Sequence, residues 1–413
     1  MLVVTANWAI PDGSVAAVPR RGQFCELIAD VHRVAVRAGF RGDGRYRPIE
    51  RLVFVLAGDT FDALLSDRWL DGIRPWERRR EAATRHADVL RQAWRHARRP
   101  LAALARLARH GIPVPPAGRH GRPVAAAHVA APVHVVILVG DRDAAVERLA
   151  GGAAAKRRGI GVGRVWDGAG LRVLHGSGCD PLAVAAEGPT LLASLTVDLL
   201  ARFGAALAGR PTFAERARRI VRLLADGQPL DMPLRLRAAL PLEADGAASA
   251  EWIIDSWRRS VDRWAREARR RGCDDDHGVV DAVAGWMHAL DGGAPQRPVT
   301  QAVLAALSAP LPLGGGGGPQ LTVVGHPAEG GGGVVCLGPR PLRRPAGLAS
   351  TARRPDGVAC IEAGASIRPA RLAAVAVFEG DEGAGHERKW WAMCDDADLA
   401  EEQAGGLPIL DAA

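Results

Sequence analysis

Apolar, branched residues occur in short runs along this chain, and several of these runs end in glycine followed by a polar side chain. The clearest run covers residues 52–57, and Gly58, Asp59 and Asp62 follow it. Such a run predicts a strand that is buried on both faces. Open α/β sheets bind their ligands outside the carboxyl ends of the strands. We therefore expect Asp59 and Asp62 to lie at a functional edge of a sheet.

Three further apolar runs end in the same way, at residues 133–139, 171–174 and 321–324. The polar side chains that follow them include Asp141, His175 and His326. A single Gly-Asp after a strand is typical of an ordinary turn or helix N-terminus. Four strand ends that each present a carboxylate or an imidazole instead indicate a shared site, because these groups are ligands of Mn, Fe, Zn and Co.

Helical spacing of apolar residues alternates with the predicted strands, which favours an α/β fold. Residues 23–38 have a broad apolar face, and residues 77–110 form a longer stretch that is rich in Arg and His. Pro100 should break or kink this stretch, and one arrangement that fits it is a pair of antiparallel helices. Its basic face suits contact with phosphates, although such a face is more often simply solvated.

The longest helical region covers residues 182–310 and predicts an insertion that caps the functional edge of the sheet. Trp252, Trp257 and Trp264 have helical spacing within it, which favours a packed apolar stripe over a stacking platform for nucleic-acid bases.

After a glycine-rich connector, the chain returns to strand patterns at residues 334–337, 358–361, 372–378 and 389–393. We expect these strands to form a second sheet or the outer edge of the first. We therefore assign residues 1–380 to one domain that includes the insertion. Residues 381–413 are expected to form a C-terminal strand and a loose tail.

Composition narrows the function only slightly. The formal net charge of +8 comes almost entirely from Arg, which permits binding to phosphorylated ligands or nucleic acid without requiring it. No Cys-x-x-Cys pair occurs among the six cysteines, which argues against a zinc ribbon and favours reduced thiols. The sequence shows no signal peptide and no apolar run of about 20 residues, so we expect a cytoplasmic protein without a transmembrane segment.

The order of these motifs resembles that of the calcineurin-like metallophosphoesterases. The second motif of that family, Gly-Asp-x-x-Asp, matches residues 58–62, and the third matches residues 140–143. Arg142 stands where most members have His, which is similar to the branch that includes UDP-2,3-diacylglucosamine pyrophosphatases. The resemblance extends to about Phe378 and implies a four-layer α-β-β-α sandwich of two mixed sheets. It also implies metal-dependent hydrolysis of a phosphate ester.

The departures from the family pattern fall on one half of its two-metal centre. The resemblance assigns one ion to positions occupied here by Ala6, Trp8 and Ala328, which cannot ligate, together with the shared Asp59. It assigns the other ion to four residues that can all ligate, namely Asp59, Asp141, His175 and His326. The implied cofactor is therefore one divalent ion: Mn, Fe, Zn or Co. A literal Asp-x-His at residues 30–32 falls inside a predicted helix and is discounted.

The remaining polar residues have expected supporting roles. The positive guanidinium of Arg142 would contact and stabilise a phosphoryl oxygen. The carboxylate of Asp143 would orient neighbouring groups of the site, and Asp62 would accept hydrogen bonds from loop amides. No replacement general acid is evident, and Glu329 and Asp12 are candidates by position alone.

Three functions remain open from the sequence. The chain hydrolyses a phosphate monoester or diester at a single-metal site, or it is an inactive scaffold that binds a ligand or partner, or it is an Arg-rich nucleic-acid binder. The partner expected for the first is a phosphorylated small molecule or a phosphodiester. The third has the least support, because no recognised nucleic-acid module is present.

Overall fold

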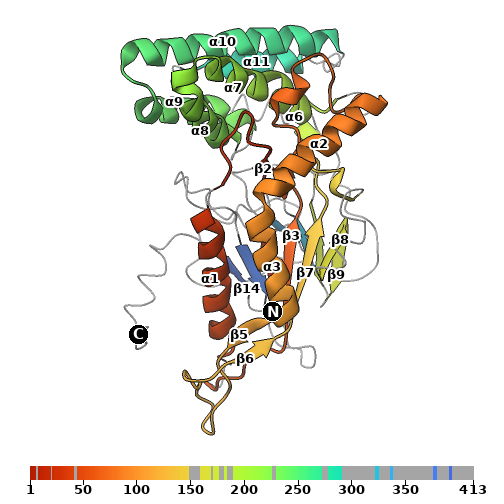
Figure 1. The fold of residues 1–413 in the computed structure, drawn as a ribbon, viewed down its shortest axis with the longest axis vertical. Helices are drawn as coiled ribbons and strands as arrows, with labels where there is room; N and C mark the ends of the chain where they lie inside the picture. The colour runs from red at the N-terminus through yellow and green to blue at the C-terminus, as the bar shows by residue number, and fades with distance from the viewer. Residues whose placement is uncertain are drawn as a thin grey trace.

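The fold is known from a computed structural model of the whole chain. It describes residues 1–5, 8–19, 21–40, 44–147, 159–168, 171–175, 181–183, 189–225, 229–271 and 278–290, and four later strands at 321–324, 335–337, 375–378 and 390–392. Within these residues the chain is a mixed α/β protein with two larger sheets and a separate layer of helices (Figure 1).

The larger sheet has six strands in the order β14-β13-β1-β3-β7-β8. Their bounds are β1 Leu2–Thr5, β3 Leu52–Ala57, β7 Val133–Leu138, β8 Ile160–Gly163, β13 Val375–Phe378 and β14 Trp390–Ala392. The strands from β1 to β8 are parallel neighbours, whereas β13 and β14 are added antiparallel at one edge. The central strand β3 is buried along almost its whole length, as its continuous apolar sequence predicts.

The second sheet has four strands in the order β12-β11-β10-β9. Their bounds are β9 Val165–Gly168, β10 Leu171–Leu174, β11 Leu321–Val324 and β12 Val335–Leu337. β10 and β11 are parallel, and the outer pairs are antiparallel. The predicted C-terminal strands therefore divide between the sheets: β11 and β12 join the second, and β13 and β14 extend the first.

Two pairs of short strands were not predicted from the sequence. β2 (Ile10–Pro11) pairs with β4 (Phe61–Asp62), and β5 (Ile112–Val114) pairs with β6 (Val129–Ala131). Strands of two or three residues are too short to have a recognisable hydrophobic period.

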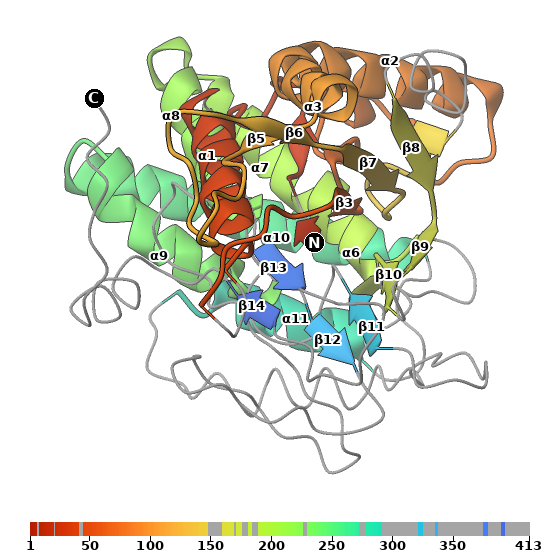
Figure 2. The ribbon, with the colours of Figure 1, turned by 90° about the horizontal axis from the view of Figure 1, so that it is seen from below.

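Helices α1 (Arg21–Arg37) and α3 (Arg98–His110) lie on one side of the six-stranded sheet, and the second sheet lies on the other side (Figure 2). The predicted antiparallel pair in residues 77–110 is wrong. α2 (Arg80–His96) and α3 follow one another with a bend at Ala97, whose φ of −76° and ψ of −2° do not reverse the chain (Figure 1). Pro100 lies in the first turn of α3, where a missing N–H removes no helical hydrogen bond.

A layer of helices covers the carboxyl ends of the central strands of the six-stranded sheet (Figure 1). It consists of α6 (Leu191–Ser194), the π-helix η4 (Leu195–Ala201), α7 (Arg202–Ala208), α8 (Ala214–Ala225), α9 (Met232–Glu243), α10 (Ala247–Arg270) and α11 (Val279–His288). This layer has its own hydrophobic core, separate from the core beneath the sheet.

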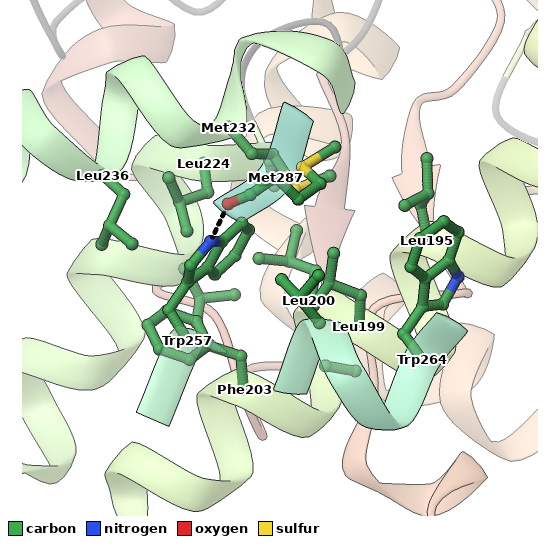
Figure 3. Packing of buried hydrophobic residues seen from close by; sticks show 14 of the residues in the cluster. Leu195, Leu199, Leu200, Phe203, Leu224, Met232, Leu236, Trp257, Trp264 and Met287 are labelled. Carbon is green, nitrogen blue, oxygen red and sulfur yellow. Dashed lines mark hydrogen bonds between the residues drawn. The ribbon is translucent and has the colours of Figure 1, made fainter. Parts of the chain in front are cut away.

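The tryptophans of α10 form part of that core (Figure 3). Trp257 and Trp264 are fully buried, and their ring N–H groups donate to the Met287 carbonyl at 2.7 Å and to Ser194 Oγ at 3.1 Å. Trp252 is half-buried, with the Arg210 guanidinium 3.8 Å from its ring centre. The prediction of a packed stripe is confirmed.

Some predictions fall on residues that the structure does not describe. The strand at 358–361 and the loose tail expected within 381–413 lie outside the described residues. The domain limits stay a prediction. Among the described residues, one helical stretch, Leu191–Ala208, is apolar and long enough to cross a membrane, and 72% of it is buried inside the protein.

Candidate functional site

Asp59 stands at a sharp turn at the carboxyl end of β3. Gly58 has a φ of 92° and Asp59 a φ of 48°, so the chain adopts the left-handed conformation at two successive residues. This conformation is unfavourable for a residue with a side chain, and such strain tends to occur at functional sites. The turn buries the Asp59 carboxylate, whose Oδ1 accepts a hydrogen bond from the Arg142 backbone N–H at 3.0 Å.

Two glycines allow the strand ends to approach one another closely. A Cβ added to Gly140, after β7, would lie 3.0 Å from Asp59 Cγ and closer still to its Oδ1. A Cβ added to Gly58 would lie 2.5 Å from Cγ of His175 and closer still to its Nδ1. The glycines that precede the acidic residues in the sequence are therefore required by packing between β3, β7 and β10.

His175 follows β10 and brings an imidazole from the second sheet to the end of the first. Its Nδ1 lies 3.0 Å from the Ala57 carbonyl oxygen, which can only accept, so Nδ1 carries the proton. Its Nε2 lies 3.6 Å from Asp59 Oδ2 and 3.6 Å from Asp141 Oδ2. The structure thus brings together three of the four predicted metal ligands.

The charges at this point strongly favour a cation between the carboxylates. Burial alone would lower the pKa of His175, but Asp59 and Asp141 outweigh burial and raise this pKa to about 9.

Arg142 links the ends of β3 and β7. Its guanidinium is almost fully buried, with Nη1 2.8 Å from Asp62 Oδ2 and Nε 3.6 Å from Asp59 Oδ2. Burial would lower the pKa of Arg142, but the charges of Asp62 and Asp59 outweigh it, so the pKa is raised and the group stays cationic. Its described contacts are with these carboxylates, and contact with a phosphoryl oxygen stays a prediction.

Two further carboxylates hold the loops in place. Asp143 accepts the Gly140 N–H at 2.7 Å and the Phe61 N–H at 3.2 Å. Burial, followed by repulsion from Asp59, raises the pKa of Asp143 to about 7. Asp62 accepts two loop amides through Oδ1, those of Leu64 and Leu65, at 3.1 and 3.0 Å, which confirms the hydrogen bonding expected of Asp62.

Of the three expected lost ligand positions, only Trp8 is among the described residues. Trp8 is buried, donates its ring N–H to Thr5 Oγ1 at 2.9 Å and packs edge-to-face on Phe24 at 5.1 Å between ring centres. Ala6 and Ala328 lie outside the described residues, as do His326 and Glu329.

The sequence did not predict how the helical layer is attached to this edge. Arg222 of α8 donates to the backbone carbonyls of Ala9 at 2.6 Å and Trp8 at 3.2 Å. The candidate acid Asp12 is buried and accepts hydrogen bonds from the hydroxyls of Ser14 and Ser66, both at 2.6 Å. No local pattern identifies Arg222, because 214 residues separate it from Trp8.

The described residues fit a metal ion in part. Neighbouring ligand atoms of a tetrahedral ion with bonds of about 2.1 Å lie about 3.4 Å apart, close to the two spacings of 3.6 Å around His175 Nε2. A metal-binding imidazole usually donates its other N–H to a carbonyl or carboxylate, as His175 does. However, no group of three His, Cys, Asp or Glu side chains within the described ranges is positioned to hold an ion.

Comparison with known proteins adds no further assignment. No family model, no curated protein and no solved structure matches this chain.

Proposed function

We propose that this chain is a metal-dependent phosphoesterase with a single-ion site, built on a calcineurin-like α-β-β-α sandwich. The observation that carries the proposal is the meeting of Asp59, Asp141 and His175 at one point, with His175 oriented by the Ala57 carbonyl. The choice of fold is supported by the two mixed sheets, because the larger one has helices on one side and the smaller sheet on the other (Figure 2).

In this proposal Asp59, Asp141 and His175 would hold a divalent ion, with His326 expected as the fourth ligand. When bound, the ion would polarise the phosphate ester and activate a water. The ion would replace the His175 proton as the positive charge that these carboxylates hold.

The surrounding residues keep the ligand atoms in position. Arg142 and Asp143 connect the β7 end to the loop after β3, which fixes Asp59 relative to Asp141. We assign to the Arg142 guanidinium the stabilisation of a phosphoryl oxygen, while Asp62 keeps it oriented. The substrate class is a phosphate monoester or diester.

A second candidate is an inactive protein of the same fold that binds a ligand or partner. The observation that favours it is the burial of Trp8, because the family resemblance puts a ligand of the second ion at this position. The two candidates differ in turnover, and they do not differ in fold.

Elemental analysis of the purified full chain tests the metal site. We expect about one divalent ion per chain for the wild type and its loss in His175→Ala. The matched control is His32→Ala, which removes the His of the literal Asp-x-His inside α1 and should keep the ion. A folded wild-type protein without metal, and without a change in melting temperature on adding Mn, Zn, Co or Fe, would contradict the proposal.

Turnover separates the two candidates. The metal-loaded chain is assayed with an aryl phosphate monoester and an aryl phosphodiester, each with the four metals. Hydrolysis that is lost in His175→Ala and kept in His32→Ala supports the phosphoesterase. A chain that binds its ion and hydrolyses neither substrate is the inactive scaffold.

A further inference from the structure

A second polar site lies in the helical layer, where it meets the segment that follows β4. Here a pocket of about 290 Å³ is lined by Leu70, Gly72, Arg74, Arg202, Arg263, Glu267, Arg270 and Arg271. We call it the arginine pocket. Its wall is formed by three parts of the chain: the loop before α2, the start of α7 and the last turns of α10.

The carboxylates that pair with these arginines in the described structure are too few to neutralise them. Asp198 accepts Arg74 Nε at 2.7 Å and Arg271 Nη1 at 2.6 Å. Glu267 lies 3.2 Å from Arg202 Nη2 and 3.1 Å from Arg263 Nε. Among the described residues, five guanidinium groups thus face two carboxylates, an excess of three positive charges.

Burial and, to a smaller extent, neighbouring charges shift the pKa of Arg202. Burial first, and then repulsion by Arg263 and Arg74, hold the pKa of this guanidinium below its ordinary value, although Glu267 and Asp198 act in the opposite direction. A bound anion would relieve this repulsion, because it would balance the guanidinium groups that the described carboxylates, Asp198 and Glu267, leave in excess.

The arginines of the pocket come from several segments of the chain, and not from one solvated helix end. Arg270 and Arg271 belong to the end of α10, where cations stabilise the helix dipole, but Arg74 and Arg202 come from other segments. Asp198 lies in the π-helix η4, and π-helical turns occur frequently at functional sites. Arg74 is almost fully buried and is oriented by Asp198 and by backbone carbonyls at Trp69 and Ile73.

We propose that the arginine pocket binds a small molecule through a multivalent phosphate group. Guanidinium groups present paired donors that match phosphate oxygens, and several of them together favour a diphosphate over a monovalent ion. At about 30 Å³ per water, the pocket has room for roughly ten waters, which suits one or two phosphate groups. The proposal is independent of the function proposed for the Asp59 site.

Isothermal titration calorimetry with inorganic pyrophosphate at low ionic strength tests this binding. The test variant is Arg263→Gln with Arg270→Gln, because both side chains line the pocket from the exposed side of α10 and neither makes the buried pairs of Arg74. The matched control is Arg258→Gln with Arg266→Gln, which removes the same charge from exposed positions of α10 outside the pocket. We expect saturable binding that weakens about tenfold or more in the test variant and stays within about twofold in the control.

Absence of saturable binding to the wild type would refute the proposal. An equal loss of pyrophosphate affinity in both double variants would also refute it, because such a loss would reflect the change in net charge alone. A parallel titration with ADP distinguishes the sources of the phosphate group. Tighter binding of ADP indicates that the protein also contacts the rest of the ligand, and equal affinity indicates recognition of the phosphates alone.

Discussion

Gly58→Ala tests whether close packing of glycine against His175 holds the candidate site together. Gly58 has a φ of 92°, and a methyl group on its Cα would lie only 2.5 Å from Cγ and 2.8 Å from Cβ of His175. Gly72 is the control, because its φ of 105° is similar and a Cβ there would meet nothing within 4 Å.

The two substitutions share one energetic term and differ in the other. An L-residue with positive φ costs about 1–2 kcal/mol, and both variants bear this cost. In Gly58→Ala the methyl group also forces His175 to move, which breaks its bond to the Ala57 carbonyl. Loss of a hydrogen bond that involves a charged group costs about 1.5–3 kcal/mol. We therefore expect a loss of about 2.5–5 kcal/mol for Gly58→Ala and about 1–2 kcal/mol for Gly72→Ala.

Urea denaturation followed by circular dichroism measures both losses, provided that the m value is unchanged between the variants. Metal content measured on the same samples should fall in Gly58→Ala and stay constant in Gly72→Ala. If the two variants lose the same stability within about 0.5 kcal/mol, the close approach of β3 and β10 does not exist in solution and the reasoning fails.

Three further predictions concern other contacts. Trp8→Ala should lower the free energy of unfolding by about 3–5 kcal/mol, because it leaves a cavity. Trp8→Phe should lower it by only about 1 kcal/mol, because it removes just the hydrogen bond to Thr5. Equal losses for the two variants in urea denaturation would contradict this packing role. Arg222→Ala should lower the free energy of unfolding by about 1–3 kcal/mol, because it removes the bonds to the Ala9 and Trp8 carbonyls. Arg237 of α9 is exposed, so Arg237→Ala should leave this free energy unchanged. Thermal denaturation measures both effects. Burial alone would raise the pKa of Glu267, but Arg263, Arg202 and Arg271 outweigh burial and lower this pKa. The ionised Glu267 therefore stabilises the fold above its unfolded pKa of about 4.5. This stabilisation is lost as the pH falls through the lower pKa of the folded state. Melting temperatures from pH 6 down to pH 3 should therefore fall less steeply in Glu267→Gln than in the wild type, and identical slopes would refute this linkage.

Much of the secondary structure follows from the sequence, because its signal is local. The buried runs at β3, β7 and β10 and the amphipathic pattern of α10 were recognised from spacing alone. The packing of Trp257 and Trp264 was recognised from the same helical period. The break that Pro100 predicted occurs just before it, at Ala97, because proline fits the first turn of a helix and cannot continue the helix that precedes it.

The candidate site was partly recognisable for the same reason. Asp59, Asp141 and His175 each follow an apolar run, and parallel strands end at the same edge of a sheet. The sequence does not show that His175 arrives from a different sheet, or that Arg142 is buried between Asp62 and Asp59. These facts depend on the relative placement of two sheets.

By itself, the sequence determined the strand runs, the helical periods and the residues that can ligate a metal, because each is encoded within a few neighbouring positions. Tertiary structure alone decided how distant segments meet. Arg74 and Asp198 pair across 124 residues, and Arg222 and Trp8 across 214. No local pattern specifies such pairs, since packing of the whole chain selects one partner among many arginines and carboxylates. For this reason the glycine contacts around Asp59 and the arginine pocket are visible only in the folded protein.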